Sequence, residues 1–513
     1  MSKQEITQTE EQLAIVEATE KERSSLMIEA YAGCAKTTSL ELLGRKVRGP
    51  ALALAFNKSI AEELKTRFAS NFVTSTMNSF GFGALRRAYP DVTKWNLDER
   101  KVGRLVSDIA KESKVDLDSE EWGAIRQVVS AAQSSGLRPE ELETETWIEL
   151  AKEKWIELDV QGASIAQAVL RENNRQIELG NISFDDQVYW PTVEEAIRLP
   201  QYPTILVDEA QDLSPLQHSM LAKATGERTR LFVCGDSRQA IYGFRGAHSE
   251  SMSFIKHLRP EWLERPLTLT FRCPKVVVER QQRHAPGFRA WHGNAEGIFS
   301  SSCAKAWDWN AVEEFRPAPA ATLAVLCRNN APLFSLAFKL LRRGIGVVML
   351  GRDLGKGLKG LVSKLAPSDL PLVKFMEKLE RWAETEIELA KLNKRGDEGP
   401  KIDSVCDRRE CLVAIADGAQ VRGSEELKRA IDKVFERERG VVTLSSIHKA
   451  KGLEWDAVLH LDPGRIPSRQ ARQAKERGDR KALEQEWNLR YVTETRSKHT
   501  LIEADLRDFD LGA

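Results

Sequence analysis

The stretch "IEAYAGCAKTTSL", residues 28–40, lies between an apolar run and a helix-length segment. It nearly matches G-x-x-x-x-G-K-[ST], the pattern of a loop whose backbone N–H groups hold the phosphates of a nucleotide. Lys36 and Thr37 are in place, but Ala30 and Ala35 replace the two glycines. Because alanine disfavours positive φ angles, we expect this loop to bind phosphate only if both alanines adopt right-handed backbone angles.

A strand–loop–helix context favours a phosphate site, since the N-terminus of the following helix also attracts an anion. In such a site the Lys36 ammonium reaches the β- and γ-phosphates of a nucleoside triphosphate, and the Thr37 hydroxyl holds Mg²⁺. The alternative for this stretch alone is an ordinary turn with a surface lysine. The predicted nucleotide-binding positions of the loop are Ala32, Gly33, Cys34, Ala35, Lys36, Thr37 and Thr38.

A second stretch, "ILVDEAQD" (205–212), is an apolar run that ends in adjacent carboxylates. This arrangement delivers Asp208 to a metal ion and places Glu209 where it polarises an attacking water. An isolated Asp-Glu pair is also typical of a solvated acidic turn. The pair follows the phosphate loop in the chain and precedes the strand-like run that leads into "CGDSRQAIYGFRGA" (234–247). This order favours the catalytic interpretation.

Strand-like runs alternate with helix-length segments in two series, each interrupted by a mainly helical block. Such alternation predicts parallel sheets with helices on their faces. We therefore predict an α/β protein with two cores: residues 1–92 and 184–262 with a helical insert at 93–183, and residues 263–350 and 436–513 with a small helical insert at 351–435. The expected strands are 25–30, 51–56, 71–75, 203–210, 229–236, 267–271, 322–328, 345–350, 440–446 and 456–462.

The composition excludes a strongly charged nucleic-acid binder. The 513 residues include 76 Lys and Arg against 76 Asp and Glu, so any site for a polyanion must be local. Neither a signal peptide nor an apolar run long enough for a bilayer is evident, which predicts a cytoplasmic protein without a membrane contact. The seven cysteines lack paired metal-ligand spacing, and we predict neither zinc nor a disulfide.

Further motifs follow these two in a recognisable order, and together they span almost the whole chain. The series resembles the superfamily 1 DNA helicases of the UvrD/Rep-like branch, and the wording "AFNKSIA" is similar to the F-box DNA helicase relatives, although no F-box segment precedes Gln12. The motifs that carry the resemblance are "TEEQLAIV" (9–16), "ALAFNKSIAEEL" (53–64), "TSTMNSFG" (74–81), "VDEAQD" (207–212), "GDSRQAIYGFRGA" (235–247), "LTLTFRCP" (267–274), "TLSSIHKAKGLEWDAV" (443–458) and "EWNLRYVTETRSK" (486–498).

The resemblance implies two RecA-like P-loop cores that bind ATP between them with Mg²⁺ held by Thr37 and Asp208. Gln12 and Phe271 would contact adenine, and Glu454 would join the ATP-binding residues. The implied catalytic residues are Glu209, Gln239, Arg272 and a finger arginine, Arg496. The implied contacts to single-stranded DNA are Phe56, Asn57, Thr76, Asn78, Ser79, Tyr242, Phe244, Arg245, His448 and Lys449.

Two departures from the family pattern bear on the site. Ala35 replaces a glycine that the family usually keeps, and "TETRSK" (493–498) stands where the family prefers "AVTRAK". The second change keeps the arginine but alters its packing.

The implied activity is an ATP-dependent DNA helicase or translocase that moves 3′ to 5′ on single strands and unwinds duplexes, in DNA repair, replication or recombination. Two alternatives stay open: a single-strand translocase that displaces bound proteins with little unwinding, and a DNA-binding scaffold whose ATP site has decayed, as Ala30 and Ala35 suggest. The expected partners are single-stranded DNA, tailed or forked duplexes, and replication or recombination proteins. We expect a monomer or weak oligomer in a bacterial or phage-infected host cytoplasm.

Overall fold

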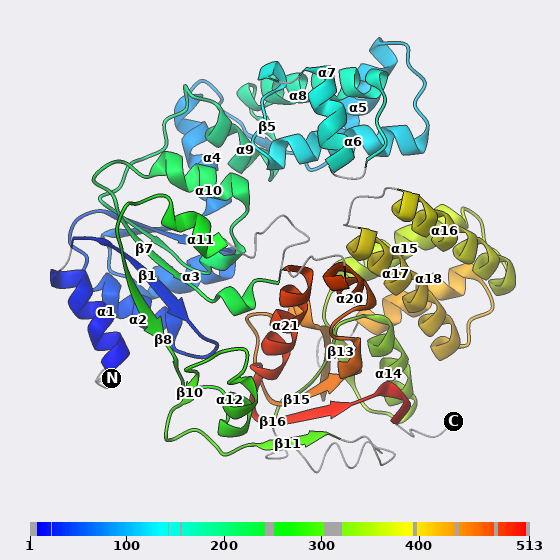
Figure 1. Ribbon diagram of the computed structural model, residues 1–513. Helices are drawn as coiled ribbons and strands as arrows, with labels where there is room; N and C mark the ends of the chain where they lie inside the picture. The colour runs from blue at the N-terminus through cyan, green and yellow to red at the C-terminus, as the bar shows by residue number, and fades with distance from the viewer. Residues whose placement is uncertain are drawn as a thin grey trace. The chain divides into compact units, whose positions relative to one another are not determined.

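The computed structural model describes residues 8–21, 23–141, 143–153, 156–241, 251–301, 321–392, 398–436, 441–476 and 481–508. The chain divides into two compact units (Figure 1). The first unit consists of the residues up to Ala30 together with Ala35–Leu267, and the second consists of Tyr31–Cys34 and the residues from Thr268 onward. Each unit is built on its own six-stranded sheet.

The sheet of the first unit has the strand order β3-β2-β6-β7-β1-β8, and all of its pairs are parallel. Its inner strands β2 and β6 are buried along their whole length, as expected for a parallel sheet with helices on both faces. Since β1, β7 and β6 are neighbours, the residues that follow them meet at one edge of the sheet. The strands are β1 (Ser25–Ala30), β2 (Ala51–Ala55), β3 (Phe72–Thr76), β6 (Thr204–Val207), β7 (Arg230–Gly235) and β8 (Trp262–Leu267).

Helices of the first unit fall into two sets. The first set connects or flanks the strands: α1 (Glu10–Lys21), α2 (Lys36–Gly44), α3 (Lys58–Arg67), α4 (Met77–Ala88), α9 (Asp186–Val193), α10 (Pro215–Ala224), α11 (Ser251–Lys256), and the short 3-10 helices η2 (Ala210–Asp212) and η3 (Ser237–Gln239). The second set lies between α4 and α9 in the chain and forms one group in Figure 1: α5 (Lys101–Glu112), α6 (Ser119–Ser134), α7 (Thr144–Glu153) and α8 (Val160–Glu178), with η1 (Pro139–Glu141) and a two-stranded parallel sheet, β4 (Asn96–Leu97) and β5 (Asn181–Ile182).

A single hydrophobic core joins this helical set to the sheet, because Leu52 and Val207 of the strands belong to the same buried cluster as Trp147 and Val169 of the helices. A buried ion pair lies at the join. Lys101 Nζ is 2.6 Å from Asp186 Oδ2, and neither side chain is exposed. Asp186 has further hydrogen-bond partners, as expected for a buried charge: the side-chain amides of Gln133 and Asn173 donate to Asp186 Oδ1, and the Ser183 N–H donates to Asp186 Oδ2.

The second unit has the strand order β11-β16-β15-β12-β14-β13, again with parallel pairs throughout. The predicted α/β fold with two parallel-sheet cores is therefore confirmed. The strands are β11 (Ile298–Ser301), β12 (Leu323–Cys327), β13 (Val347–Met349), β14 (Val442–Ser446), β15 (Trp455–Leu461) and β16 (Ser497–Ala504).

One expected strand, 267–271, is wrong. Leu267 is the last residue of β8 and pairs with Ala30 in the first sheet, so β8 runs past the expected limit of the first core at residue 262. Only β9 (Leu269–Thr270) remains, and it pairs with β10 (Arg289–Ala290) in a separate two-stranded sheet. The apolar pattern was misleading because "LERPLTLT" passes from one sheet to the other within a few residues.

Helices α14 to α18 of the second unit share one core with their sheet. Val325 and Leu444 of the strands lie in the same buried cluster as Phe375, Leu412 and Ile431 of helices between β13 and β14. The helices are α12 (Lys275–Gln281), α14 (Ala331–Arg342), α15 (Arg352–Leu365), α16 (Leu372–Leu392), α17 (Glu398–Ala419), α18 (Ser424–Phe435), α19 (Ile447–Ala450), α20 (Arg469–Glu476) and α21 (Lys481–Glu494), with the 3-10 helices η5 (Pro463–Arg465) and η6 (Leu506–Asp508).

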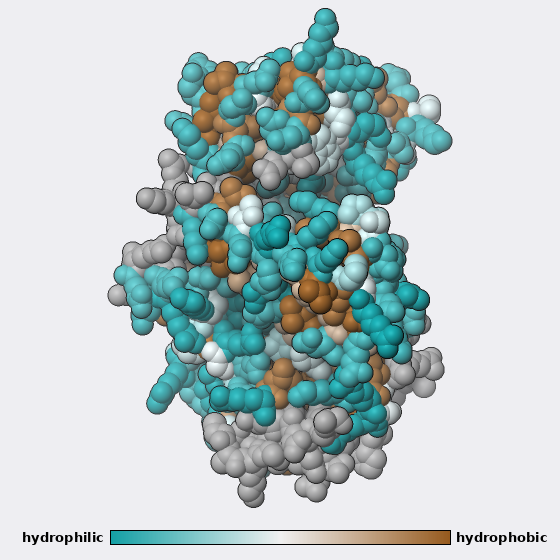
Figure 2. Space-filling view, turned by 90° about the vertical axis from the view of Figure 1, so that its right-hand side faces the viewer, coloured by the Kyte–Doolittle hydropathy of each residue, from teal (hydrophilic) through white to brown (hydrophobic). Residues whose placement is uncertain are grey.

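The face of the molecule drawn in Figure 2 is mainly polar. Hydrophilic residues predominate there, and hydrophobic residues form separate patches. Among the described helices, none is both long enough and apolar enough to cross a membrane. The described cysteines, Cys34, Cys234, Cys273, Cys327, Cys406 and Cys411, are all free thiols.

Candidate nucleotide site

The predicted phosphate loop connects β1 to α2, which begins at Lys36. Ala35 immediately precedes that helix with φ 55° and ψ 41°, a left-handed conformation, and Gly33 has φ 70°. Ala35 therefore does not meet the condition of right-handed angles that the sequence analysis set for phosphate binding, whereas Ala30 lies within strand β1. The sharp turn from strand to helix requires a left-handed residue here, which is why this position usually holds glycine.

Ala35, the N-cap residue of α2, makes no side-chain hydrogen bond to the first N–H groups of this helix, unlike the N-cap residues of many helices. Such N–H groups are suited to an anion.

Residues 31–34 of the loop are anchored within the second unit. The Ala32 N–H donates to the Tyr491 hydroxyl at 2.8 Å, and the Tyr31 hydroxyl donates to the Pro286 carbonyl at 2.7 Å. The Phe271 N–H donates to the Gly33 carbonyl. A Cβ at Gly33 would lie 2.6 Å from both Arg272 Cβ and Thr270 Oγ1, so the close approach and the positive φ both require glycine here.

Strand β6 delivers the two predicted carboxylates to the same edge as Lys36. Lys36 Nζ lies 3.1 Å from Glu209 Oε2, and Asp208 is buried. Burial opposes the charge of Lys36, but Glu209, Asp236 and Asp208 more than offset it and raise the lysine pKa. Burial and the neighbouring Glu209 raise the pKa of Asp208 to about 7, although Lys36 acts in the opposite direction.

This excess of buried carboxylate over positive charge fits a cation. Among the described residues, no group of three or more His, Cys, Asp or Glu side chains is arranged to hold a metal. Mg²⁺ does not require such a group, since it is usually held by one or two protein ligands, waters and phosphates. Asp208 and the Thr37 hydroxyl are therefore a suitable donor set for Mg²⁺ bound with a nucleotide.

Two buried polar residues that the sequence analysis did not single out connect Glu209 with Gln239. Gln211 Nε2 donates to Glu209 Oε2 at 2.5 Å, and its Oε1 accepts from the Asp236 N–H at 3.0 Å. Asp236 Oδ2 in turn accepts from Gln239 Nε2 at 2.6 Å. The signal that could have identified Asp236 is its position directly after strand β7, whereas Gln211 lies in η2, a few residues beyond the end of β6.

The predicted adenine reader, Gln12, lies on α1 and is buried. Its Nε2 donates to Ser39 Oγ of α2, and its Oε1 accepts from the Thr9 N–H at 3.0 Å. The structure thus brings Gln12 to the helix that begins at Lys36.

In the second unit, the predicted site residues gather around Arg272. Arg272 Nε lies 2.5 Å from Glu454 Oε2, and Lys498 Nζ is 3.6 Å from Glu454 Oε1. Phe271 is 41% exposed, and its ring centroid is 6.0 Å from that of Trp291, an exposed aromatic residue that the sequence analysis did not consider. These exposed rings beside a cation are suited to a nucleotide base.

Arg496 is only 1% exposed. Its guanidinium donates to the Val492 carbonyl at 3.0 Å, to the Leu453 carbonyl at 3.3 Å and to Thr495 Oγ1 at 3.1 Å. The residue predicted as a finger is thus held by the backbone at the end of α21.

The residues predicted to contact DNA in the first unit follow strands β2 and β3, and Phe56 is half-buried there. Asn57 and Thr76 also cap helices, since they accept from the N–H groups of Ile60 and Ser79. Asn78 Nδ2 donates to the Phe184 carbonyl at 2.7 Å.

In the second unit, His448 and Lys449 lie on α19, directly after β14. Lys449 Nζ is 4.0 Å from Asp353 Oδ2. Tyr242, Phe244 and Arg245 lie outside the described residues.

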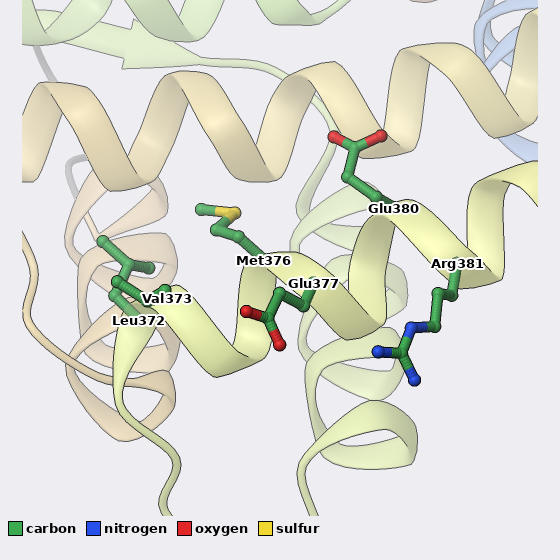
Figure 3. Close-up of a pocket in the computed structure, with 6 residues that line it drawn as sticks. All are labelled: Leu372, Val373, Met376, Glu377, Glu380 and Arg381. Carbon is green, nitrogen blue, oxygen red and sulfur yellow. The ribbon is translucent and has the colours of Figure 1, made fainter.

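A shallow pocket in the second unit is separate from all of these residues. It is lined by a single stretch of α16, and Figure 3 shows the polar ends of Glu377, Glu380 and Arg381 pointing in different directions. Glu380 Oε2 pairs with Arg409 Nη1 of α17 at 3.1 Å. The pocket shares no residue with the predicted nucleotide site.

Two parallel sheets, a lysine at the start of the helix after β1 and an Asp-Glu pair after β6 define a P-loop nucleotide-binding class of protein. Comparison with known protein families identifies the family within this class. The UvrD/REP helicase N-terminal domain matches residues 8–259, and the UvrD-like helicase C-terminal domain matches residues 377–504. The chain belongs to the UvrD-like superfamily 1 helicases, which confirms the resemblance seen in the motifs.

Similar curated proteins include F-box DNA helicase protein 1 of Schizosaccharomyces pombe, 24% identical over 97% of this chain and 57% of that protein. The ATP-dependent DNA helicase UvrD2 of Mycobacterium tuberculosis is 25% identical over 93% of this chain and 76% of that protein. DNA helicase II of Escherichia coli is 24% identical over 58% of this chain and 44% of that protein. The chain spans about half the length of the F-box relatives that it matches, 57% of one and 49% of another.

Proposed function

We propose that the protein is a DNA-dependent ATPase that couples ATP hydrolysis to movement on single-stranded DNA, in the 3′ to 5′ direction, and to duplex unwinding. The observation that carries this proposal is the Lys36–Glu209 contact beside the buried Asp208, at one edge of a parallel sheet in a UvrD-like helicase. The names of the relatives, which include an ATP-dependent DNA helicase, support the same activity.

Each residue has a role that its position allows. Lys36 and the first N–H groups of α2 bind phosphate oxygens, while Thr37 and Asp208 hold Mg²⁺. Bound Mg²⁺ would neutralise phosphate charge during the displacement. Glu209 accepts a proton from the attacking water, and its contacts with Lys36 and Gln211 hold it in place before substrate binds.

The second unit supplies further contacts in this proposal. Arg272 is released from Glu454 to bind phosphate, and Arg496 stabilises charge in the transition state, an effect worth ~10³–10⁵ in rate where a finger arginine operates. Phe271, with Trp291 beside it, contacts the adenine. Hydrolysis then changes the contacts that ATP makes, and this change drives movement along DNA.

Steady-state ATP hydrolysis, measured with and without a single-stranded oligonucleotide, tests the proposal. We expect strong stimulation by DNA that is lost in Glu209→Gln. The matched control is Glu264→Gln, because Glu264 also pairs with a lysine, Lys256, but is exposed on β8. Its turnover should equal that of the unaltered protein.

Strand displacement on duplexes with a 3′ or a 5′ tail separates unwinding from translocation alone. Displacement that requires the 3′ tail supports the helicase. DNA-stimulated hydrolysis without displacement favours the translocase, and DNA binding without any hydrolysis favours the scaffold, for which the left-handed Ala35 is the motivating observation.

A further inference from the structure

Glu494, in the segment "TETRSK" (493–498), is a charged residue whose side chain is only 1% exposed. It is the last residue of α21. Its carboxylate accepts hydrogen bonds from Arg280 at 3.2 Å, from Arg490 Nε at 2.9 Å and from Gln281 Nε2 at 2.8 Å. A buried carboxylate with this many partners is specifically accommodated.

The charged groups around the Glu494 carboxylate balance one another. Arg280 and Arg490 also contact Glu503 of β16, at 3.2 Å and 2.8 Å. Two guanidinium groups therefore face two carboxylates, and the Arg280 guanidinium carbon also lies 3.6 Å from the centroid of the Phe299 ring. Burial would raise the pKa of Glu494, but Arg280 and Arg490 more than offset it and lower that pKa, so the carboxylate is ionised at neutral pH.

The cluster joins the two segments that carry the arginines of the site. Arg280 and Gln281 form the last turn of α12, a short helix that begins three residues after Arg272. Glu494 lies two residues before Arg496. A second contact between the same segments, from Cys273 Sγ to the Thr495 carbonyl at 3.7 Å, lies close to both arginines.

The guanidinium of Arg496 is aimed by this same end of α21, because it donates to the Val492 carbonyl and to Thr495 Oγ1. A displacement of the end of α21 therefore moves the guanidinium with it. The hydrogen bonds from Arg280 and Gln281 to Glu494 link this end of α21 to the helix that follows Arg272.

We propose that Glu494 is a positioning residue for ATP hydrolysis, which holds Arg496 at a fixed place relative to Arg272 by binding α12 through Arg280 and Gln281. This inference rests on the proposed function. It assigns a role to a buried charged residue that lies two positions before Arg496.

The test compares Glu494→Gln with Glu503→Gln in ATP hydrolysis at saturating single-stranded oligonucleotide. The two variants remove the same charge from the same pair of arginines, but Glu503 lies on β16, seven residues beyond Arg496. We expect Glu494→Gln to lower kcat by about 10- to 100-fold, as for a small misplacement of a catalytic group. KM for ATP should change less than about twofold, because the arginine acts in the transition state. Glu503→Gln should keep its kcat.

Two further variants separate positioning from general destabilisation. Glu494→Asp keeps the carboxylate and should recover part of the kcat that Glu494→Gln loses. This variant also tests the inference if Glu494→Gln folds poorly. In an Arg496→Lys background, Glu494→Gln should have little further effect, because the group that it positions is already changed.

Three outcomes would overturn this inference while leaving the proposed function intact. They are an unchanged kcat in Glu494→Gln, an equal loss of kcat in Glu503→Gln, and a full additional loss of kcat when Glu494→Gln is added to Arg496→Lys. Absence of ATP hydrolysis in the unaltered protein would overturn the proposed function, and this inference with it.

Discussion

Ala35 combines a left-handed backbone with a side chain that opposes it. A left-handed conformation costs an L-residue ~1–2 kcal/mol, whereas a glycine gains conformational freedom in the unfolded chain worth ~0.4–1 kcal/mol. We therefore expect Ala35→Gly to stabilise the protein by up to about 1 kcal/mol and to retain ATP hydrolysis. Thermal unfolding measures the change.

The matched control is Ala124→Gly within α6, where a glycine should cost about 1 kcal/mol. A similar loss of stability in Ala35→Gly would mean that the backbone at residue 35 carries no strain. A gain in nucleotide affinity in Ala35→Gly would show that the alanine weakens the site without inactivating it.

Sequence spacing placed Lys36, Asp208 and Glu209 correctly at one edge of the sheet, because the ends of neighbouring parallel strands meet there. The conformation of Ala35 was not accessible in this way, since the required turn depends on how β1 and α2 are placed. Two partners of Glu494, Arg280 and Gln281, come from α12, more than two hundred residues earlier in the chain, so a local sequence pattern does not predict these contacts.

At the scale of elements, α4 and α9 are in contact through Gly81. A Cβ at this residue would lie 1.9 Å from the Gln187 carbonyl oxygen and 2.8 Å from Met220 Cε. We expect Gly81→Ala to lower the melting temperature, because α4 and α9 must separate, and overpacking of this kind typically costs ~1–3 kcal/mol.

Gly83→Ala provides the control on the same helix. Its Cβ would meet nothing closer than Arg87 Nη1 at 3.6 Å, so helix propensity alone should make this change neutral or stabilising by up to about 1 kcal/mol. Equal effects of the two substitutions in thermal unfolding would contradict the close contact of α4 with α9.

Position in the sheet did not decide which strands were predicted, because the edge strands β3 and β13 were predicted and the inner strand β16 was not. β2 and β12 are apolar throughout and buried, and their positions agree with the predicted runs. By contrast, β8, with the sequence "WLERPL", and β11 lie at sheet edges and mix polar with apolar residues, which hides their pairing from a hydropathy pattern. The crossing from β8 to β9 was misplaced for the same reason.

At the scale of the whole molecule, stability in acid should depend on His460. This residue is fully buried in β15, and burial lowers its pKa from 6.5 to about 4. Glu503 and Glu494 favour the protonated ring, while Arg490 and Arg280 oppose it. Because the unfolded state binds the proton first, this residue costs no stability above about pH 6.5 and progressively more as pH falls toward 4, about 3 kcal/mol in total.

His460→Leu should therefore flatten the loss of stability between pH 6.5 and pH 4, as measured by urea unfolding across this range. His257→Leu is the control, because His257 is exposed on the surface of the first unit. An acid profile of His460→Leu that runs parallel to that of the unaltered protein would show that the buried imidazole does not contribute.

The overall charge balance bears on how the protein holds DNA. With 76 basic and 76 acidic residues, attraction to single-stranded DNA must come from a few local contacts, such as Lys449 on α19, whose side chain is 48% exposed. Each phosphate contact on a single strand contributes about 0.7 to the slope of log K against log salt. We therefore expect a slope of about 3 or less in magnitude, measured by fluorescence anisotropy of a labelled oligonucleotide between low and moderate salt.

Lys449→Gln should reduce the slope by about 0.7, while Lys359→Gln on α15, whose lysine pairs with Asp432, should leave it unchanged. A slope steeper than about 6 would require many more phosphate contacts than a neutral protein with a local site provides, and would place the DNA on a basic surface that the chain-wide charge balance conceals.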